Sequence, residues 1–496
     1  MIWAPFLHLY QPADQQPDIL EAIVSQCYRP IIKKLVKHKK ARITLNINGA
    51  LLELFDQSEY RGLIDDLKKL LGRGQIGLTG SAKYHAFLPF LSTEEAARQI
   101  MLNTETLHYF FGEEYQKSGF FPPEMGWKDS LAEVIEELGF KWVILDEIAF
   151  NGKVDCVDYS RIYKISGRNL NVFFRERRAS NMIMSAMAHS AKVVEETLRP
   201  IMKSDRYLLT AMDGETFGHH HAGLEKMLFE VFASKKFELM RISDLMKTFK
   251  EELTVLPIDS TWASSPQDIE ESIQFLSWSD PANQIHKWQW EFVDLALSLV
   301  RSYPKDSPEY KELRPKMDRA LASDHFWWAS AKPWWSLEMI ELGAYRLLNI
   351  VKLAPHRNDD ILKKAKELYE KIVSTAFEWQ RSGLIRKMAK GRSIANKIPF
   401  KDRTWGLGGM GGAVYKGFLA LLKEQEKEAA FEGEYERAIL WRDAIWRMEN
   451  RTDIYEAINA IDLLHVEAGD KKIAKVIEKY KNEFQRLRGG QPEDRF

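Results

Sequence analysis

Short apolar runs alternate with longer amphipathic segments over the first half of the chain. Apolar residues recur at three- and four-residue steps in the longer segments, which is typical of helices. The strand candidates are Ile2–His8, Arg42–Ile47, Ile76–Thr79, Gly119–Phe121, Trp142–Leu145, Asn171–Phe174 and Tyr207–Ala211, and the helix candidates include Tyr60–Leu71, Thr93–Phe111 and Ser130–Leu138. Strands that alternate with helices predict parallel βαβ units with a buried sheet. We therefore expect an α/β fold with an incomplete seven-stranded (β/α)7 barrel.

The pattern changes near Leu256. Residues 256–266 are rich in turn formers and predict an irregular loop. Farther on, apolar residues follow helical spacing in Ile285–Leu299 and Ile361–Trp379. We expect a barrel over residues 1–255, an irregular linker with the character of an active-site loop over 256–284, and an α-helical C-terminal domain over 285–496. The glycine-rich run Trp405–Gly412 has no lysine of a phosphate-binding loop and predicts a tight connection between helices.

The composition is typical of a folded protein with large cores. The chain has 496 residues, of which 45% are apolar and 12% aromatic, and its 71 basic residues equal its 71 acidic ones. A neutral chain does not favour nucleic acid as a partner, whereas 15 tryptophans mildly favour a carbohydrate, because indole faces stack on sugar rings. The two cysteines, the lack of a signal peptide and the lack of a run of about 20 apolar residues predict a cytoplasmic protein without a membrane span. The oligomeric state stays open.

Carboxylates follow two of the predicted strands. Glu124 comes after Phe120, Phe121 and two prolines, and Asp213 and Glu215 come after the run Tyr207–Ala211. The carboxyl ends of parallel barrel strands face the active site, so two carboxylates there could flank a glycosidic bond. Beside an ionised Glu124, Asp213 would hold its proton more tightly and could act as the acid. In the alternative interpretation, Glu124 is a loop residue that pairs with a nearby lysine or arginine, and Asp213 or Glu215 caps the next helix.

Histidines and tryptophans supply further candidates. His8, at the end of the first strand, could hydrogen-bond a sugar hydroxyl or serve a structural role. The run His219–His221 favours substrate contacts or loop packing over a metal site, because adjacent histidines point in different directions. Four tryptophans lie between Trp327 and Trp335. Either one member of each adjacent pair stacks on a sugar, or the group forms an aromatic interface between the barrel and the helical region.

Five segments resemble, in order, the motifs of glycoside hydrolase family 57. These are His8–Pro12, Gly74–His85, Pro123–Trp127, Asp213–Gly218 and Ser323–Trp327. The resemblance implies a seven-stranded barrel followed by helices, action on α-glucans, and retention of configuration at the anomeric carbon. It implies that Glu124 is the nucleophile and Asp213 the general acid/base. We expect the substrate to be bound by His8, Gln11, His85, Trp127, Glu215, His219, Asp324 and Trp327.

Two positions depart from the family pattern. Gly77 stands where the second motif often has a glutamate, and Asn181 stands where an aspartate is common. Neither belongs to the catalytic pair. Both bear on the identity of the substrate.

The sequence thus predicts a retaining, α-amylase-like enzyme that acts on an α-glucan or maltooligosaccharide without a metal or organic cofactor. If a second glucan replaced water as acceptor, the activity would be that of a 4-α-glucanotransferase or a branching enzyme. One rival is a metal-dependent hydrolase, such as a polysaccharide deacetylase or zinc α-mannosidase, with Asp213, His219 and His8 as ligands. The other is a catalytically inactive glucan-binding protein, which Gly77 motivates.

Overall fold

The chain folds into two compact units. The first comprises Met1–His219 with Glu225–Arg386, and the second comprises His220–Leu224 with Lys387–Phe496. The predicted domain boundaries at residues 255 and 284 stay a prediction. The computed structural model describes residues 2–186, 188, 190–198, 205–250, 252–332, 334–391, 411–450, 460–461, 463–464, 468 and 470–487.

A parallel sheet in the first unit carries the strand that places His8. Its strand order is β3-β2-β1-β8, and a short strand β9 also pairs with β1. The bounds are Ile76–Thr79 for β3, Ile43–Ile47 for β2, Ile2–Leu9 for β1, Tyr207–Asp213 for β8 and Glu238–Leu239 for β9. In the register, His8 lies opposite Asn46 of β2 and Asp213 of β8. The sheet therefore aligns three polar residues at one edge.

A second sheet carries the strand that precedes Glu124. Its order is β10-β6-β7-β5-β4, and all its pairings are parallel except that of β6 with β7. The bounds are Glu252–Val255 for β10, Ile162–Ile165 for β6, Asn171–Arg175 for β7, Trp142–Asp146 for β5 and Gly119–Phe120 for β4. The two sheets are linked by a parallel bridge between Gly80 and Phe120, and by a hydrogen bond of 2.8 Å from the Glu176 N–H to the Leu209 carbonyl oxygen.

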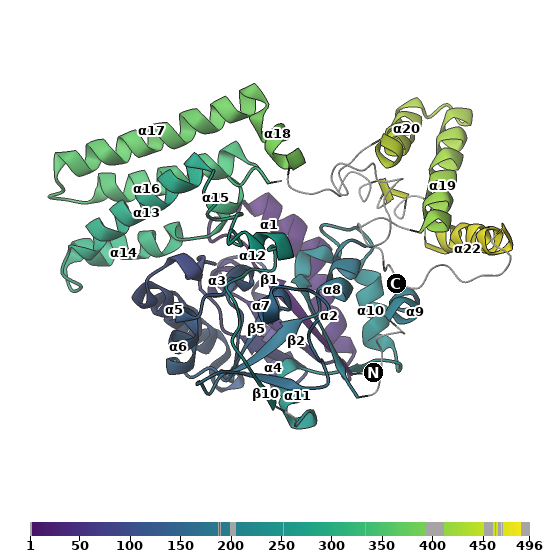
Figure 1. Ribbon diagram of the computed structural model, residues 1–496, viewed down its shortest axis with the longest axis horizontal. Coiled ribbons are helices and arrows are strands. Elements are labelled where there is room, and N and C mark those ends of the chain that lie inside the picture. Colours follow the sequence, from purple (N-terminus) through teal and green to yellow (C-terminus); the bar gives the residue numbers. More distant parts are fainter. Residues whose placement is uncertain are drawn as a thin grey trace. The chain divides into compact units, whose positions relative to one another are not determined.

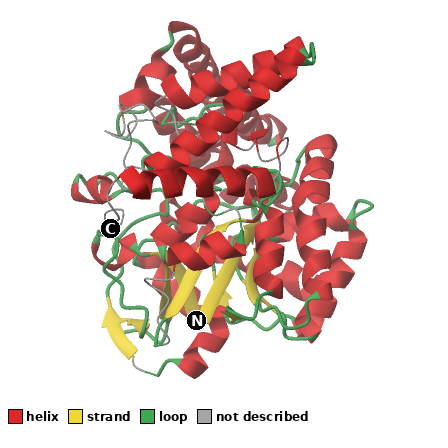
Figure 2. Ribbon diagram, turned by 90° about the vertical axis from the view of Figure 1, so that its right-hand side faces the viewer, coloured by secondary structure: helices red, strands yellow, loops and turns green. Residues whose placement is uncertain are grey.

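All the predicted strands are present, with ends within two residues of those expected. The strands β6, β9 and β10 were not predicted. Helices flank the strands, which are yellow in Figure 2. They are α1 (Pro17–Ile23), α2 (Arg29–Lys37), α3 (Gly49–Asp56), α4 (Arg61–Gly72), α5 (Thr93–Phe111), α6 (Ser130–Glu137), α7 (Ile148–Asn151), α8 (Arg177–Met184), α9 (Ala191–Leu198), α10 (Glu225–Ala233) and α11 (Ile242–Thr248). The irregular segment predicted after Leu256 contains one short helix, α12 (Pro266–Glu270).

A run of helices follows, and the first of them is α13 (Gln284–Arg301). The Asn283 side chain caps α13 by accepting hydrogen bonds from the N–H groups of Ile285 and His286. The helices, green in Figure 1, are α13 (Gln284–Arg301), α14 (Pro308–Ala320), α15 (Asp324–Trp327), α16 (Leu337–Leu353), α17 (Asp359–Ser382) and α18 (Leu384–Gly391). The buried Arg314 of α14 donates to Glu95 of α5 at 2.9 Å, so an ion pair ties this helical part to the helices around the sheets.

The second unit is mainly helical where it is described. It contains α19 (Gly412–Phe431), α20 (Tyr435–Asn450) and α22 (Asp470–Leu487), which pack around buried Leu421, Leu422 and Trp441. Most of the glycine-rich run, Trp405–Met410, lies outside the described residues. Among the helices that the structure describes, none combines the length and the apolar character needed to cross a bilayer.

Candidate active site

Glu124 stands in an unusual backbone conformation just after β4. Its φ of 61° and ψ of 16° lie in the left-handed region, which costs free energy for a residue other than glycine. Two prolines precede it, and the next residue, Met125, also has a positive φ of 48°. Trp127 then pairs with Ser260 in an antiparallel bridge. The turn is therefore held on both sides, which fixes the carboxylate in one direction.

Trp262 holds both the main chain and the side chain of Glu124. Its indole N–H donates to Oε2 of Glu124 at 2.8 Å, and its backbone N–H donates to the Glu124 carbonyl at 3.2 Å. The Nδ1 atom of His85 lies 3.9 Å from the other carboxylate oxygen, Oε1. The Glu124 side chain keeps 17% of its exposure, so it is held firmly and remains accessible.

Three aromatic rings connect the Glu124 side of the site with β1. The His85 ring stacks on His8 at 5.0 Å and on Tyr10 at 4.2 Å between centroids. Burial lowers the pKa of His8 to about 4, although its hydrogen bond to Asn46 opposes the shift. Burial and the charge of His8 also lower the pKa of His85. Both rings are therefore neutral near pH 7 and can act through hydrogen bonds.

Hydrogen bonds join these rings to the helical part. Tyr10 donates to Asp324 at 2.6 Å, and Nδ1 of His85 lies 3.0 Å from the Ser323 hydroxyl. The buried Nε2 of His85 has no hydrogen-bond partner among the described residues. A buried polar atom without a partner is costly unless a ligand pairs with it, so His85 is well placed to bind one.

Asp213 and Glu215 lie at the end of β8, which pairs with β1. Asp213 precedes a 3₁₀ turn at Gly214–Thr216, but its side chain makes no capping hydrogen bond. Gln11 donates to Glu215 at 3.2 Å, and the Tyr28 hydroxyl donates to the same oxygen. Glu215 is thus held by neutral donors.

Burial raises the pKa values of all three carboxyl groups, and the charge of Asp213 raises those of the two glutamates further. Burial raises the pKa of Glu124 to about 8, with a further contribution from the charge of Asp213. Burial raises the pKa of Asp213 to about 6, against the charge of Arg175, which lowers it. Burial and then Asp213 raise the pKa of Glu215 to about 8. The charge of Asp213 thus acts on both glutamates, and the groups cannot all be ionised at neutral pH.

The structure brings together His8, Gln11, His85, Glu215 and Asp324 of the predicted substrate-binding residues. Each contacts another residue of the cluster in the hydrogen bonds and ring stacks given above. Glu124 and Asp213 belong to the same cluster through His85 and through the register of β1 with β8.

Three other candidates lie in different surroundings. Trp127 is completely buried, and its indole N–H donates to the Pro257 carbonyl, so it anchors the loop and its placement does not support a substrate contact. His219 pairs with Gln26 at 2.8 Å. Trp327 is half-buried and stacks on Trp334 at 4.6 Å. A role of these side chains in substrate binding stays a prediction.

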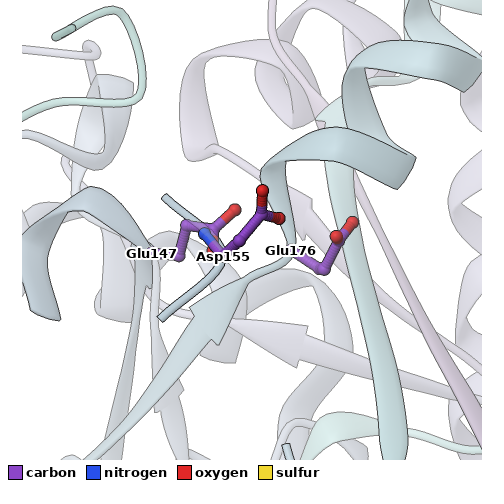
Figure 3. A group of neighbouring side chains, drawn as sticks. All are labelled: Glu147, Asp155 and Glu176. Carbon is purple, nitrogen blue, oxygen red and sulfur yellow. The ribbon is translucent and has the colours of Figure 1, made fainter. Parts of the chain in front are cut away.

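Of the metal ligands of the rival interpretation, His8 and Asp213 lie opposite each other in β1 and β8, whereas His219 pairs with Gln26. In the described part of the chain, one group of three acidic side chains, drawn in Figure 3, has ligand atoms close enough to share an ion, and it includes none of His8, Asp213 and His219. The rival interpretation has no support from this geometry.

Trp262, Tyr28 and Arg175 were not predicted as site residues. Trp262 lies in the irregular loop predicted after Leu256, and Tyr28 lies in a helical segment near β1. Arg175 is a charged residue at the end of a buried strand, which is a signal that sequence reasoning could have used. Its guanidinium donates to Asp146 at 2.8 Å and to Asn181 at 2.6 Å.

The two departures from the family pattern have different surroundings. Asn181 accepts a hydrogen bond from Arg175, so a neutral amide stands where an aspartate would partly neutralise the cation that acts on Asp213. Gly77 pairs with Thr44 inside β3, two residues before the strand ends, and a Cβ there would lie 3.7 Å from the side chain of Arg241.

A site built from carboxylates and aromatic rings at strand ends is typical of an enzyme that acts on carbohydrates. The chain belongs to glycosyl hydrolase family 57, whose model matches residues 6–257. It is 24% identical over 304 residues to an α-amylase of Pyrococcus horikoshii, covering 58% of this chain and 45% of that protein. It is 23% identical over 313 residues to a 4-α-glucanotransferase of Thermococcus litoralis, covering 58% and 43%.

The fold has known counterparts. The crystal structure of a family 57 branching enzyme of Pyrococcus horikoshii superposes with a TM-score of 0.57 at 13% identity, covering 76% of this chain and 96% of that one. The matched part of this chain spans less than half the length of the α-amylase and the glucanotransferase. The comparisons therefore establish the family and the fold.

Proposed function

We propose that this protein is a retaining glycosidase that cleaves α-1,4-linked glucan, with Glu124 as nucleophile and Asp213 as general acid/base. The observation that carries the proposal is the fixed Glu124 carboxylate, held by Trp262, in electrostatic contact with Asp213 on a different strand. A separation of about 5 to 5.5 Å between the two carboxyl groups, as retaining enzymes have, stays a prediction.

The proposed reaction proceeds in two displacements. A Glu124 oxygen attacks the anomeric carbon while Asp213 gives its proton to the glycosidic oxygen, which leaves with the first product. Asp213 then removes a proton from water, which attacks the same carbon and releases Glu124. Carboxyl groups perform both the covalent and the proton-transfer steps, so the scheme uses no metal or organic cofactor.

The pKa values do not by themselves assign the two roles. Their order favours the proton on Glu124, because Arg175 stabilises the ionised form of Asp213. The proposed cycle needs the proton on Asp213 and an ionised Glu124 when the substrate is attacked. The assignment of the roles therefore rests on the family motifs, on the fixed backbone of Glu124 and on the test with Asp213 variants described below.

The pH dependence of kcat/KM for maltoheptaose is expected to be bell-shaped. The active pair carries one proton: below about pH 6 both groups are protonated and no nucleophile remains, and above about pH 8 both are ionised and no acid remains. Initial rates across buffers of constant ionic strength measure this profile. A rate that stays constant down to about pH 4 would contradict the raised pKa values.

We also propose that the two sheets form the incomplete barrel. The order β8-β1-β2-β3-β4-β5-β7 contains the predicted seven strands. The bridge of Gly80 with Phe120 supports the junction of β3 with β4, and the bond from Glu176 to Leu209 supports the junction of β7 with β8. In such a barrel, Glu124 and Asp213 both lie at the carboxyl ends of their strands.

Incubation with maltoheptaose tests the activity and the acceptor. If water is the acceptor, we expect only shorter sugars, and proton NMR of the first products should show the α-anomer. Longer sugars beside shorter ones would assign the protein to 4-α-glucanotransferases or branching enzymes, the alternative that its similarity to such a transferase supports. A first product in the β-configuration would overturn the retaining mechanism. Unchanged substrate after days would favour an inactive glucan-binding protein.

We further propose a cytoplasmic location. The thiols of Cys27 and Cys156 are both free, and Cys156 is exposed. An exposed free thiol is compatible with a reducing compartment.

A further inference from the structure

A short turn carries Trp262, whose indole N–H donates to the Glu124 carboxylate at 2.8 Å. The Ser264 N–H donates to the Thr261 carbonyl at 3.2 Å, which closes the turn, and the Thr261 N–H donates to the Ser264 hydroxyl at 2.9 Å. The turn lies between β10 and α12 and belongs to no helix or strand. Its position relative to Glu124 therefore depends on contacts that other segments supply.

Arg177, the first residue of α8, holds the carbonyl groups of this turn. Its Nη2 atom donates to the Trp262 carbonyl at 3.1 Å, and its Nη1 atom donates to the Ser264 carbonyl at 2.6 Å. A guanidinium carries its N–H donors in a rigid plane, so two of them fix the two carbonyls at a set spacing. The Arg177 side chain keeps 15% of its exposure, so these hydrogen bonds are mostly shielded from water.

Asp146 fixes the guanidinium of Arg177 from the other side. Asp146 is the last residue of β5, and its side chain is completely buried. Its Oδ1 atom accepts from Nε of Arg177 at 2.9 Å and lies 2.7 Å from Nη2. The Ile148 N–H donates to the same oxygen at 3.0 Å. The strand therefore positions the carboxylate, and the carboxylate positions the guanidinium.

The other oxygen of Asp146 orients a second arginine toward the same tryptophan. Oδ2 accepts from Nη1 of Arg175 at 2.8 Å. The Arg175 guanidinium carbon lies 5.9 Å from the centre of the Trp262 ring, within the range of a cation–π contact. The ring also packs on Phe121 at 5.8 Å between centroids. One buried carboxylate thus orients two arginines, of which one holds the backbone at Trp262 and the other lies over the indole ring.

We propose that Arg177, oriented by Asp146, is a positioning residue for the nucleophile, because its hydrogen bonds to the turn keep the Trp262 indole N–H directed at the Glu124 carboxylate. The inference rests on the proposed role of Glu124. A displacement of a reacting group by about 1 Å can cost on the order of 10²-fold in rate. Arg177 therefore affects the rate through Trp262, without forming or breaking a bond itself.

A double-mutant cycle tests the route through Trp262. Arg177→Met removes the guanidinium, and Trp262→Phe removes the indole N–H but keeps an aromatic ring. We expect each variant alone to lower kcat on maltoheptaose by about 10- to 100-fold. Added to Trp262→Phe, Arg177→Met should lower kcat by less than about threefold, because the hydrogen bond that it would disturb is already absent. An equal loss from Arg177→Met in both backgrounds would overturn the proposal.

The indole resonance of Trp262 tests the same contact without catalysis. In protein labelled with isotope-enriched tryptophan, the indole N–H resonance that Trp262→Phe removes belongs to Trp262. We expect Arg177→Met to move this resonance toward that of an indole in water. Arg178→Met, at the exposed next position of α8, is the matched control and should leave both the resonance and kcat unchanged. An unchanged resonance in Arg177→Met would overturn the proposal. A moved resonance in a protein that leaves maltoheptaose intact would support the contact and refute only the proposed function.

Arg177→Lys keeps a positive charge beside Asp146 and is the variant to use if Arg177→Met does not fold. One ammonium group does not reproduce the planar fork that spans the carboxylate and both carbonyls. We therefore expect kcat to fall by about tenfold or more, with Tm close to that of the native enzyme. Native kcat in Arg177→Lys would show that the charge alone matters and would overturn the proposal.

Discussion

Replacing Glu124 with glutamine is expected to lower kcat on maltoheptaose by on the order of 10⁴-fold or more, because an amide cannot form the glycosyl-enzyme intermediate. This corresponds to about 5 kcal/mol in the activation free energy. Glutamine keeps the size of the side chain and an oxygen that can accept the Trp262 indole N–H. Rates from product analysis, compared at the pH optimum of the native enzyme, measure the effect.

The stability of this variant separates a catalytic role from a structural one. The folded-state pKa of Glu124 is about 8, so ionisation of the buried carboxyl destabilises the fold as pH rises from about 4.5 to about 8. Glutamine removes that cost, and Tm of Glu124→Gln at pH 8 should equal or exceed that of the native enzyme. Glu137→Gln, on the exposed face of α6, is the matched control and should leave activity and Tm unchanged. A Glu124→Gln enzyme with undiminished turnover would contradict the assignment.

Buried parallel strands could be predicted from the sequence because their apolar runs are continuous. The β2 residues Ile43–Ile47 are all buried, and the prediction of this strand was confirmed. Of the missed strands, β9 and β10 lack that signal, whereas β6 (Ile162–Ile165) is mostly buried but its apolar run is interrupted by Lys164. The first three residues of β10, Glu252–Val255, are exposed, and β9 has only two residues. Such short edge strands are fixed by their partners rather than by their own pattern.

The site could be predicted where its residues lie in local motifs at strand ends, as Glu124 and Asp213 do. It could not be predicted where the decisive contact joins distant segments. Trp262 and Glu124 are 138 residues apart, and Tyr28 and Glu215 are 187 residues apart. Such pairs depend on the loop that follows the sheets and on the packing of helices, which leave no periodic signal in either segment.

Removing the Asp213 carboxyl is expected to slow the cleavage of a substrate more when its leaving group needs a proton. Hydrolysis of maltoheptaose by Asp213→Ala should fall by about 10²- to 10⁴-fold, because the sugar leaving group needs an acid. Cleavage of α-maltotriosyl fluoride to the covalent intermediate should fall much less, because fluoride leaves without a proton. Hydrolysis of the intermediate is then slow, because no base activates the water. Azide needs no base, so added azide should accelerate turnover and give the α-glycosyl azide.

The anomeric configuration of the azide product shows whether Glu124 or Asp213 is the nucleophile. If Asp213 were the nucleophile, as a lower pKa than that of Glu124 would allow, the fluoride would also react slowly, and azide would attack directly to give the β-azide. Glu124→Ala, in the proposed mechanism, should give that β-product. The proposed roles need an ionised Glu124 during attack, whereas Arg175 favours an ionised Asp213. In the proposed mechanism, substrate binding therefore moves the proton from Glu124 to Asp213, and an α-azide from Asp213→Ala would assign the nucleophile to Glu124.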